Sequence, residues 1–235
     1  MTTSEADFHY KRLPNESPEY RAARNQLLAQ EVSLREQLER VAALRRQLPL
    51  GGELKEDYEF EEIDLWDGST RPICFSEIFG DNTDLLVYSY MYGPDWKSPC
   101  PSCTSVIDGI NAASRHVRQQ VELVVIGKAT TAQLYEIAKE RNWQDLRLLS
   151  SEKNDYARDY HSQPGETSES LMPVINAFQK ESDKICHFWA SELLWTPMEG
   201  GHRRHVDIVW PVWGLLDMTR SGRHPEKTPQ LRYKE

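Results

Sequence analysis

Two cysteines three residues apart carry the strongest chemical signal in this chain. Cys100 and Cys103 enclose the sequence CPSC. The pair comes after a continuous apolar run, residues 85–91, and before a stretch whose apolar residues have helical spacing. Pro101 suits the first turn of a helix, where its missing N–H leaves no bond unmade. The sequence therefore predicts a CxxC pair at the start of a helix that follows a buried strand, a pattern typical of thiol–disulfide redox chemistry.

The helix start also predicts different roles for the two sulfurs. Free backbone N–H groups at Ser102 and Cys103, together with the positive end of the helix dipole, favour a thiolate at Cys100. We expect Cys100 to attack a disulfide and Cys103 to resolve the mixed disulfide that results. Lys97 would lower the pKa of Cys100 further, and Trp96 would shield the sulfur and contact the substrate. Both are equally well explained as ordinary surface residues of the loop.

The elements that position this pair follow from the apolar patterning after residue 52. The sequence predicts strands at residues 58–65, 71–75, 85–91, 122–126, 146–149, 174–178 and 184–189, and helices at 76–79, 103–119, 132–142 and 154–160. Alternating strands and helices require a parallel sheet with right-handed crossovers. The polar segments before the second and the last strand predict antiparallel hairpins, the first with its turn at Asp67-Gly68. We therefore expect one α/β domain over residues 53–235.

Residues 1–52 are expected to form a helical arm. A single long helix is predicted over residues 17–48, with Ser17 as N-cap and Pro18 at its first position. Its apolar stripe repeats every seven residues, at Leu27, Leu34, Val41 and Leu48. Packing along the chain's own domain is the favoured interpretation, and a homodimer through this helix is the alternative.

Several segments resemble a known family. The stretch MYGPDWKSPCPSCTSVIDGIN (91–111), together with residues 151–161 and 213–226, resembles a bacterial family of uncharacterised proteins described as predicted dithiol-disulfide oxidoreductases with a CPxC motif. The order strand, CxxC, helix, strand, helix, followed by Met172-Pro173 before a hairpin, resembles the thioredoxin-like superfamily. The likeness covers nearly the whole chain.

The resemblance implies a fold and a chemistry. The fold would be a thioredoxin-like three-layer sandwich with a central mixed sheet, a long N-terminal helix and an N-terminal β-hairpin. A cis Met172–Pro173 bond would follow, with both residues shaping the substrate groove. The partners would be protein or small-molecule disulfides and thiols, and no cofactor is implied. Pro99 stands where thioredoxin has Trp, and Pro-Ser where it has Gly-Pro, so the direction of the reaction stays open.

Two other functions stay open on the same fold. Peroxiredoxins place a proline and a Thr or Ser before their reactive cysteine, and Pro94, Ser98 and Cys100 give this pattern with one residue fewer before the cysteine. A thiol peroxidase is therefore the first alternative. The second is a binding scaffold in which the CPSC pair is catalytically idle.

The remaining candidate residues favour structural roles. Cys74 and Cys186 lie in predicted strands and are expected to be small buried hydrophobic residues. The histidines of the HRRH segment, His202 and His205, are too closely spaced for a common zinc site, so no metal is expected. The sequence favours core covering over substrate contact for a group of four tryptophans, Trp189, Trp195, Trp210 and Trp213.

Composition limits the partners and the compartment. The 235 residues include 37 acidic and 28 basic side chains, a net charge of −9, which argues against nucleic acid and anionic membranes as partners. The N-terminal segment lacks the apolar core of a secretory signal, and the apolar runs are strand-sized. We expect a cytoplasmic protein in which the four cysteines form no structural disulfides.

Overall fold

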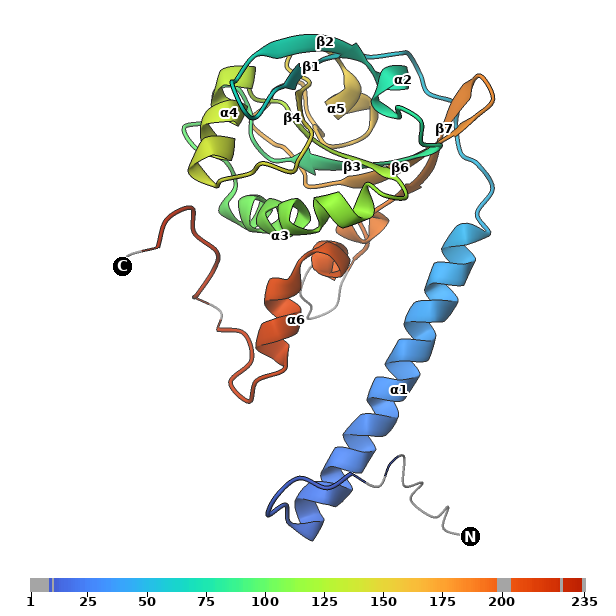
Figure 1. Cartoon of the computed structure of the whole chain (residues 1–235), viewed down its shortest axis with the longest axis vertical. Helices are drawn as coiled ribbons and strands as arrows, with labels where there is room; N and C mark the ends of the chain where they lie inside the picture. Colours follow the sequence, from blue (N-terminus) through green and yellow to red (C-terminus); the bar gives the residue numbers. More distant parts are fainter. Residues whose placement is uncertain (1–8, 10, 198–203, 225, 234–235) are drawn as a thin grey trace. The chain divides into compact units, whose positions relative to one another are not determined.

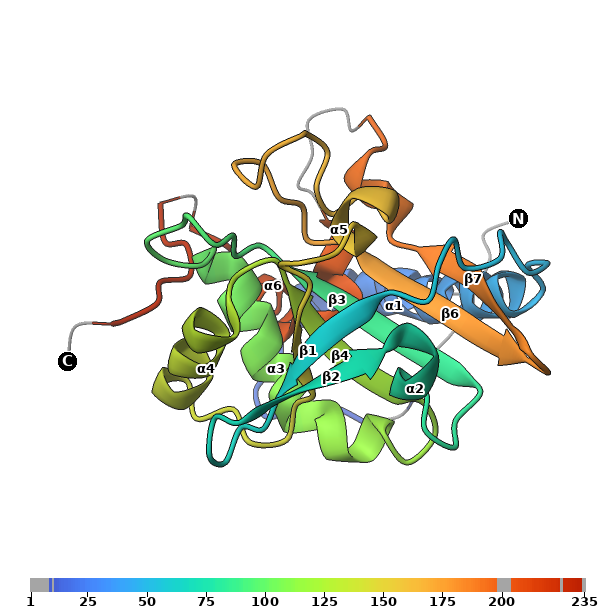
Figure 2. The ribbon, with the colours of Figure 1, turned by 90° about the horizontal axis from the view of Figure 1, so that it is seen from above.

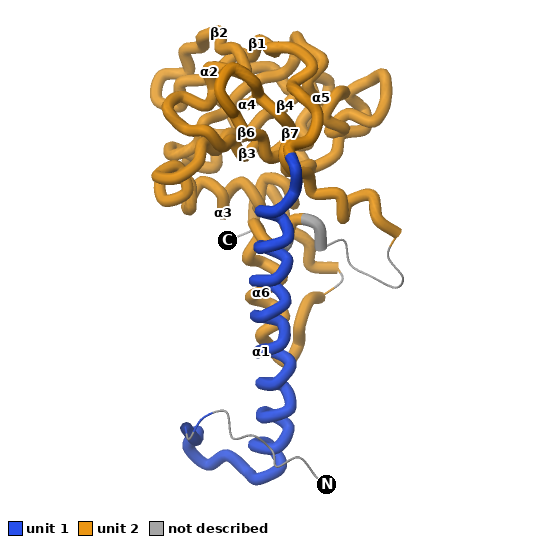
Figure 3. The backbone as a smooth tube through the Cα atoms, turned by 90° about the vertical axis from the view of Figure 1, so that its right-hand side faces the viewer, with its two compact units in different colours: residues 1–49 blue, residues 50–235 orange. Residues whose placement is uncertain are grey.

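The structure is a computed structural model that describes residues 9, 11–197, 204–224 and 226–233. The chain divides into two compact units, residues 1–49 and 50–235, which Figure 3 distinguishes by colour. Each unit is described by itself.

The first unit contains one helix, α1 (Pro18–Arg46), close to the predicted bounds. Ser17 caps it by accepting a hydrogen bond from the backbone N–H of Tyr20 (3.1 Å), and Pro18 occupies its first turn. The apolar stripe is exposed, with Leu34 at 60% and Leu44 at 63%. The two predicted uses of this stripe, packing within the chain and dimerisation, stay predictions.

The second unit is built on one seven-stranded mixed sheet in the order β2-β1-β5-β4-β3-β6-β7. Neighbours β3, β4 and β5 are parallel, and every other pair is antiparallel. The strands are β1 (Glu59–Ile63), β2 (Thr70–Cys74), β3 (Asp84–Tyr90), β4 (Glu122–Gly127), β5 (Leu148–Ser150), β6 (Ile175–Glu181) and β7 (Lys184–Ala190). Every predicted strand is present, and β6 runs three residues further than predicted.

Helices cover both faces of this sheet (Figures 1 and 2). One core packs α3 (Pro101–Val117) and α4 (Thr131–Glu140) against the sheet. The other packs α2 (Phe75–Ile78) and α5 (Tyr156–Asp159) on the opposite face. Three further elements follow β7: the 3-10 helices η1 (Glu192–Leu194) and η2 (Arg204–Val209), and α6 (Pro211–Asp217). The fold is the predicted thioredoxin-like three-layer sandwich.

Both hairpins close as predicted, each with a residue in the left-handed region. Gly68 has φ +78° in the turn between β1 and β2, where a Cβ would lie 2.7 Å from the Tyr135 ring. Ser182 has φ +54° in the two-residue turn between β6 and β7. A short connection of two twisted strands favours positive φ, which explains the conformation of both residues.

The prediction of a cis Met172–Pro173 bond is wrong: the described residues contain no cis peptide bond. The backbone N–H of Val174 donates to the carbonyl of Met172 (3.1 Å), which closes a three-residue turn around Pro173. Proline's fixed φ is close to that of an inverse γ-turn, and the trans bond is the lower-energy isomer. The segment therefore enters β6 without isomerisation.

A buried ion-pair network ties β1 to the start of β5. Glu62 is 8% exposed, and its carboxylate accepts a hydrogen bond from Nε of Arg147 (2.6 Å) and another from Arg71. Arg147 also donates to the carbonyl of Ile78 (2.7 Å) and lies 3.5 Å from Glu122. Burial acts to raise the pKa of Glu62, but the two arginines outweigh it and hold that pKa below its ordinary value.

Candidate active site

The end of β3 and the start of α3 hold the CPSC motif in place. The backbone N–H of Cys100 donates to the carbonyl of Met91 (3.1 Å), one residue after β3 ends. Cys100 is the N-cap of α3 in extended conformation, and Pro101 is in the first turn, as predicted. The Thr104 hydroxyl donates to the carbonyl of Cys100 (3.0 Å) and lies 2.6 Å from the Tyr90 hydroxyl. The motif is thus fixed to the sheet from both sides.

The two cysteines of the motif differ in exposure and acidity. Both are free thiols; Cys100 is half-buried and Cys103 is 3% exposed. A hydrogen bond from the Cys103 thiol and, to a smaller extent, the backbone N–H groups of Cys103 and Ser102 together lower the pKa of Cys100 to about 6, against the opposing effect of burial. These amides face the sulfur without forming a capping hydrogen bond to the neutral thiol. At neutral pH Cys100 is therefore mainly thiolate.

Cys103 shows the reverse behaviour. Its hydrogen bond to Cys100 is the largest effect that raises the pKa of Cys103, followed by burial and by the charge on Cys100. The Tyr88 hydroxyl acts in the opposite direction and lowers this pKa. A proton shared between the two sulfurs therefore belongs to Cys103 while Cys100 carries the charge.

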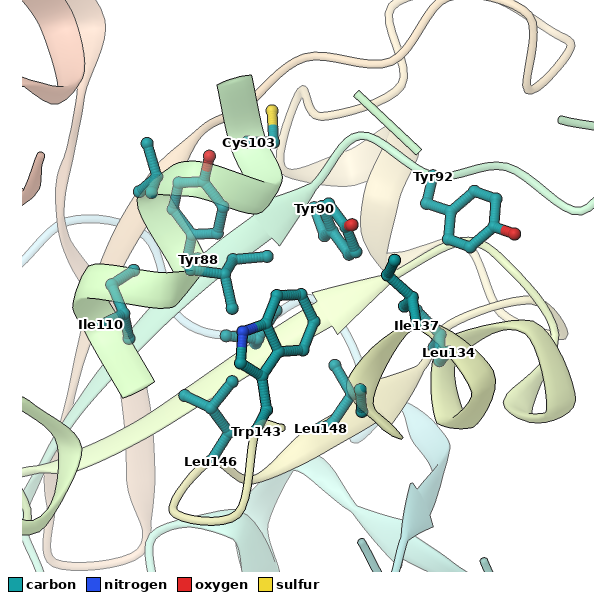
Figure 4. Packing of buried hydrophobic residues seen from close by; sticks show 14 of the residues in the cluster. Tyr88, Tyr90, Tyr92, Cys103, Ile110, Leu134, Ile137, Trp143, Leu146 and Leu148 are labelled. Carbon is teal, nitrogen blue, oxygen red and sulfur yellow. The ribbon is translucent and has the colours of Figure 1, made fainter. Parts of the chain in front are cut away.

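The Tyr88 hydroxyl is an unusual buried group. Tyr88 is 2% exposed, and its hydroxyl makes no hydrogen bond of normal geometry to any described residue. Figure 4 shows Tyr88, Tyr90 and Cys103 together at one edge of the core between the sheet and α3. A buried polar group without a partner is destabilising unless something else binds it. Tyr88 was not among the residues singled out from the sequence.

A cavity of about 310 Å³ opens beside the two sulfurs. Its wall comes from the end of β3, the start of α3, the loop before β6 and the segment after β7. The described residues that line it are Tyr88, Met91, Cys100, Ser102, Cys103, Val106, Met172, Pro173, Leu194, Val206, Trp210 and Trp213. The predicted groove residues Met172 and Pro173 thus lie in the same cavity wall as Cys100.

Trp96 and Lys97 lie elsewhere. The Trp96 indole donates to the carbonyl of Ser168 (2.8 Å), which links the loop to a distant segment, and Trp96 does not line the cysteine cavity. Lys97 is exposed and lines a separate cavity with Glu136. The groups that lower the pKa of Cys100 all lie within the motif. The expectation that Lys97 tunes this pKa is therefore not supported, because local amides and Cys103 account for the effect.

The residues of the peroxidase-like pattern are not gathered around Cys100. Ser98 is exposed and lines the separate cavity that Lys97 lines. The carbonyl of Pro94 accepts a hydrogen bond from the Gln133 side chain (2.9 Å), so this residue fixes the loop to α4. The cavity beside Cys100 contains neither residue in its described wall.

Trp210 and Trp213 line the cysteine cavity, although the sequence favours core covering for them. Trp210 is buried, its indole donates to Oγ of Ser105 (3.1 Å), and the Trp213 ring lies 5.2 Å from it. Both line the cysteine cavity, whereas Trp189 is half-buried and Trp195 is exposed. No local pattern marks Trp210 and Trp213 for this role, because a chain reversal after β7 brings them to α3.

Cys74 and Cys186 do not line the cavity. Cys74 and Cys186 are half-buried rather than fully buried, because they lie on β2 and β7, the two edge strands of the sheet. His202 and the side chain of His205 lie outside the described residues. Within the described residues no group of three His, Cys, Asp or Glu side chains has the geometry to hold a metal ion. No helix in the described part of the chain is long and apolar enough to span a membrane.

Comparisons with known proteins give a family match and distant structural likenesses. A family model described as "Bacterial protein of unknown function (DUF899)" matches residues 11–235. No curated protein matches the chain. Similar solved structures include AhpC from Enterococcus faecalis (14% identity, 57% of this chain and 77% of that one, TM-score 0.44). Thioredoxin peroxidase I from Plasmodium yoelii has 13% identity over 77% of this chain and 99% of that one, with TM-score 0.46. Peroxidoxin BcpB from Mycobacterium tuberculosis has 16% identity over 69% and 94%, with TM-score 0.43.

Proposed function

The chain belongs to the DUF899 family of bacterial proteins of unknown function, and from its site we propose that it is a thiol–disulfide oxidoreductase. One observation carries the proposal: a low-pKa thiol at Cys100 faces a cavity, with the Cys103 thiol hydrogen-bonded behind it. The proposal includes a cytoplasmic location, because a reducing compartment keeps such a pair available as the dithiol.

The first step is attack of the Cys100 thiolate on a substrate disulfide. A bond forms between the Cys100 sulfur and one substrate sulfur, and the substrate's own S–S bond breaks. The second substrate sulfur leaves as a thiolate and takes a proton from water. Cys100 suits this step because it is charged at neutral pH and lies in the cavity wall, whereas Cys103 is protonated and buried.

The second step releases the bound half of the substrate. Once Cys100 is in a mixed disulfide it no longer carries a charge or accepts the hydrogen bond that raised the pKa of Cys103. The Cys103 pKa therefore falls, its proton leaves, and its thiolate attacks the Cys100 sulfur. The Cys100–Cys103 disulfide forms, the bond to the substrate breaks, and two electrons have passed from the protein to the substrate. An external dithiol restores the reduced protein for another turnover.

Trapping tests the assignment of the two sulfurs. Cys103→Ser retains the attacking thiolate but lacks the resolving sulfur, so it should accumulate a mixed disulfide with an added substrate disulfide, visible as an adduct by intact-mass spectrometry. Cys100→Ser should form no such adduct. Adducts on both variants to the same extent, or on Cys100→Ser alone, would contradict the assignment.

A paired assay separates this function from its alternatives. The reduced full-length chain would be given insulin and a small disulfide in one arm and hydrogen peroxide in the other, with dithiothreitol as reductant. Disulfide reduction that depends on both Cys100 and Cys103 supports the proposal. Peroxide consumption alone would indicate a thiol peroxidase, the first alternative on this fold. Activity in neither arm would indicate a binding scaffold.

A further inference from the structure

We propose that the cavity beside Cys100 selects small, uncharged, apolar disulfides and rejects anionic ones and extended peptides. This inference rests on the proposed function and names its substrate class. The site is the 310 Å³ cavity that Cys100 lines with the orphaned Tyr88 hydroxyl, Trp210 and Trp213.

Apart from the Cys100 thiolate, the described wall of the cavity carries no charged side chain. Its polar atoms are the two cysteine sulfurs, the Tyr88 hydroxyl and Ser102, and the rest is aliphatic, aromatic, methionine or proline surface. The neighbouring cavity that Lys97 lines is different, because Glu136, Lys139 and Arg232 also border it. A carboxylate entering the cysteine cavity would lose its hydration, meet the like charge of the Cys100 thiolate and gain no opposite charge from the described wall. An apolar group would instead be stabilised by leaving water.

The volume suits a small molecule. Binding sites for small ligands range over roughly 300–1,000 Å³ and are mostly apolar with a few polar groups. The cavity is at the lower end of that range, enough for one apolar arm of a small disulfide next to the Cys100 sulfur.

The backbone beside the cavity disfavours an extended peptide. A bound peptide strand needs free N–H and C=O groups on the protein. The N–H of Met172 donates to the carbonyl of Ser162 (2.8 Å), Pro173 has no N–H, and the N–H of Val174 donates to the carbonyl of Met172. The loop that faces Cys100 therefore has no N–H available to pair with a substrate chain.

The C-terminal segment holds the aromatic side of the cavity in place. The Trp213 ring packs on Trp210, and the Arg223 guanidinium lies 4.7 Å from the Trp213 ring centroid. Arg223 borders a different cavity, so its charge is outside the cysteine site.

The test compares disulfides of similar length that differ in charge. The probes are dimethyl 3,3′-dithiodipropionate, which is uncharged, and the corresponding dicarboxylate. Single-turnover rates of the reduced full-length chain would be measured at pH 7, and each divided by the rate of free dithiothreitol with the same probe. This ratio removes the intrinsic reactivity of each disulfide. The ester should react at least about tenfold faster than the dicarboxylate, the discrimination that a small apolar site supplies.

A pair of variants tests whether the cavity causes the selection. Leu194→Lys places an ammonium in the cavity wall, so it should raise the relative rate of the dicarboxylate and lower that of the ester. Leu193→Lys is the matched control, because Leu193 is the adjacent residue, 59% exposed, and outside the cavity wall. It should leave the ratio of the two rates unchanged.

The outcomes separate the inference from the proposed function. Equal normalised rates for ester and dicarboxylate, or insulin reduced faster than the ester, would overturn the selection of small uncharged disulfides while leaving an oxidoreductase. A ratio that Leu193→Lys and Leu194→Lys change equally would also overturn it. No reduction of any probe, with folded protein by circular dichroism, would instead remove the proposed function.

Discussion

Cys100 and Cys103 lie one helical turn apart, yet the pKa values of their thiols are shifted in opposite directions. The shared proton and the helix amides lower the pKa of Cys100, while burial and the nearby thiolate raise that of Cys103. The structure adds Tyr88, whose hydroxyl faces Cys103, while the groups that lower the pKa of Cys100 lie within the motif and a role for Lys97 stays a prediction. The pKa values of the two thiols are thus set by groups within one turn of α3 and by Tyr88 of β3.

Cysteine alkylation as a function of pH tests the low pKa of Cys100. The thiolate is the reactive form, so the alkylation rate of Cys100 by iodoacetamide should rise between pH 5 and 7 with a midpoint of about 6 and then level off. Burial and nearby carboxylates raise the pKa of the Cys74 thiol, so its rate should still be rising above pH 8. Site-specific adducts are counted by mass spectrometry of digests.

A midpoint for Cys100 near the ordinary cysteine value of about 8.5 would contradict this account. Lys97→Gln is the control, and it should leave the midpoint unchanged because the effect comes from within the motif. A clearly raised pH midpoint of Cys100 alkylation in Lys97→Gln would show that Lys97 lowers the pKa of Cys100.

Tyr88→Phe tests the role of the orphaned hydroxyl as a positioning group for Cys103. Because this hydroxyl lowers the pKa of Cys103, its loss should raise that pKa and slow resolution of the mixed disulfide at pH 7 roughly three- to tenfold. The alkylation midpoint of Cys100 should not move. Resolution is followed by quenched-flow mass spectrometry across pH, where the midpoint should shift upward.

Stability distinguishes this role from a structural one. Tyr88→Phe removes a buried hydroxyl without a normal partner, so the free energy of unfolding should be unchanged or slightly higher. Tyr90→Phe is the matched control: it breaks the bond to Thr104 and should lower stability without slowing resolution. If both variants lower stability and slow resolution alike, Tyr88 is only a packing residue.

At the scale of elements, the site depends on how strands and helices are joined. The end of β3 fixes the motif through Met91, and α3 presents Cys100 at its first turn. The side of the sheet away from β6 and β7 is tied together by Glu62 of β1, whose carboxylate is buried with Arg147 just before β5. This network makes the hairpin β1–β2 part of the same unit as the parallel strands.

Arg147→Met should destabilise the chain by about 1–3 kcal/mol at pH 7, because Glu62 keeps only Arg71, Glu122 keeps only Arg118 and the Ile78 carbonyl loses its donor. In the parent chain the pKa of Glu62 is depressed, so its contribution is present above the unfolded value of about 4.3 and is lost as pH falls through the folded pKa. In the variant Arg71 alone opposes burial, so the pKa of Glu62 is less depressed and the difference in stability from the parent chain should narrow at low pH. Urea unfolding at pH 7 and about pH 4 measures both.

The matched control for this network is Arg118→Met. Arg118 also binds Glu122 (2.7 Å), but its side chain is 36% exposed, so the change should cost no more than about 1 kcal/mol. Equal losses for the Arg118 and Arg147 variants would show that burial does not decide the strength of this network.

At the scale of the whole molecule, the two units differ in how much apolar surface they bury. Residues 50–235 contain a complete sheet, two cores and the cysteine cavity. Residues 1–49 contain a helix without a buried residue, whose leucines are exposed along one stripe. Isolated helices are marginal in water, and an exposed apolar stripe favours association.

A homodimer through this stripe, the alternative to its packing along its own chain, is an interpretation that the oligomeric state tests. Full-length protein should elute as a dimer in size-exclusion chromatography with light scattering, and Leu34→Glu combined with Leu38→Glu should convert it to a monomer. Both positions are more than half exposed, so the substitutions leave the second unit intact. A monomeric parent chain at tens of micromolar (roughly the range in which transient pairs dissociate), or a dimer that persists in the double variant, would contradict the prediction.

The sequence by itself determined the order of strands and helices, the hairpin turns and the position of the CPSC pair at the start of α3, because these depend on local periodicity, capping and turn residues. Only the tertiary structure decided what surrounds the sulfurs. Tyr88, Trp210 and Trp213 come from segments far apart in the chain, and the trans Met172–Pro173 bond follows from a turn closed by Val174. Local patterns cannot encode such contacts, because they arise only when the sheet and the segment after β7 are packed on α3.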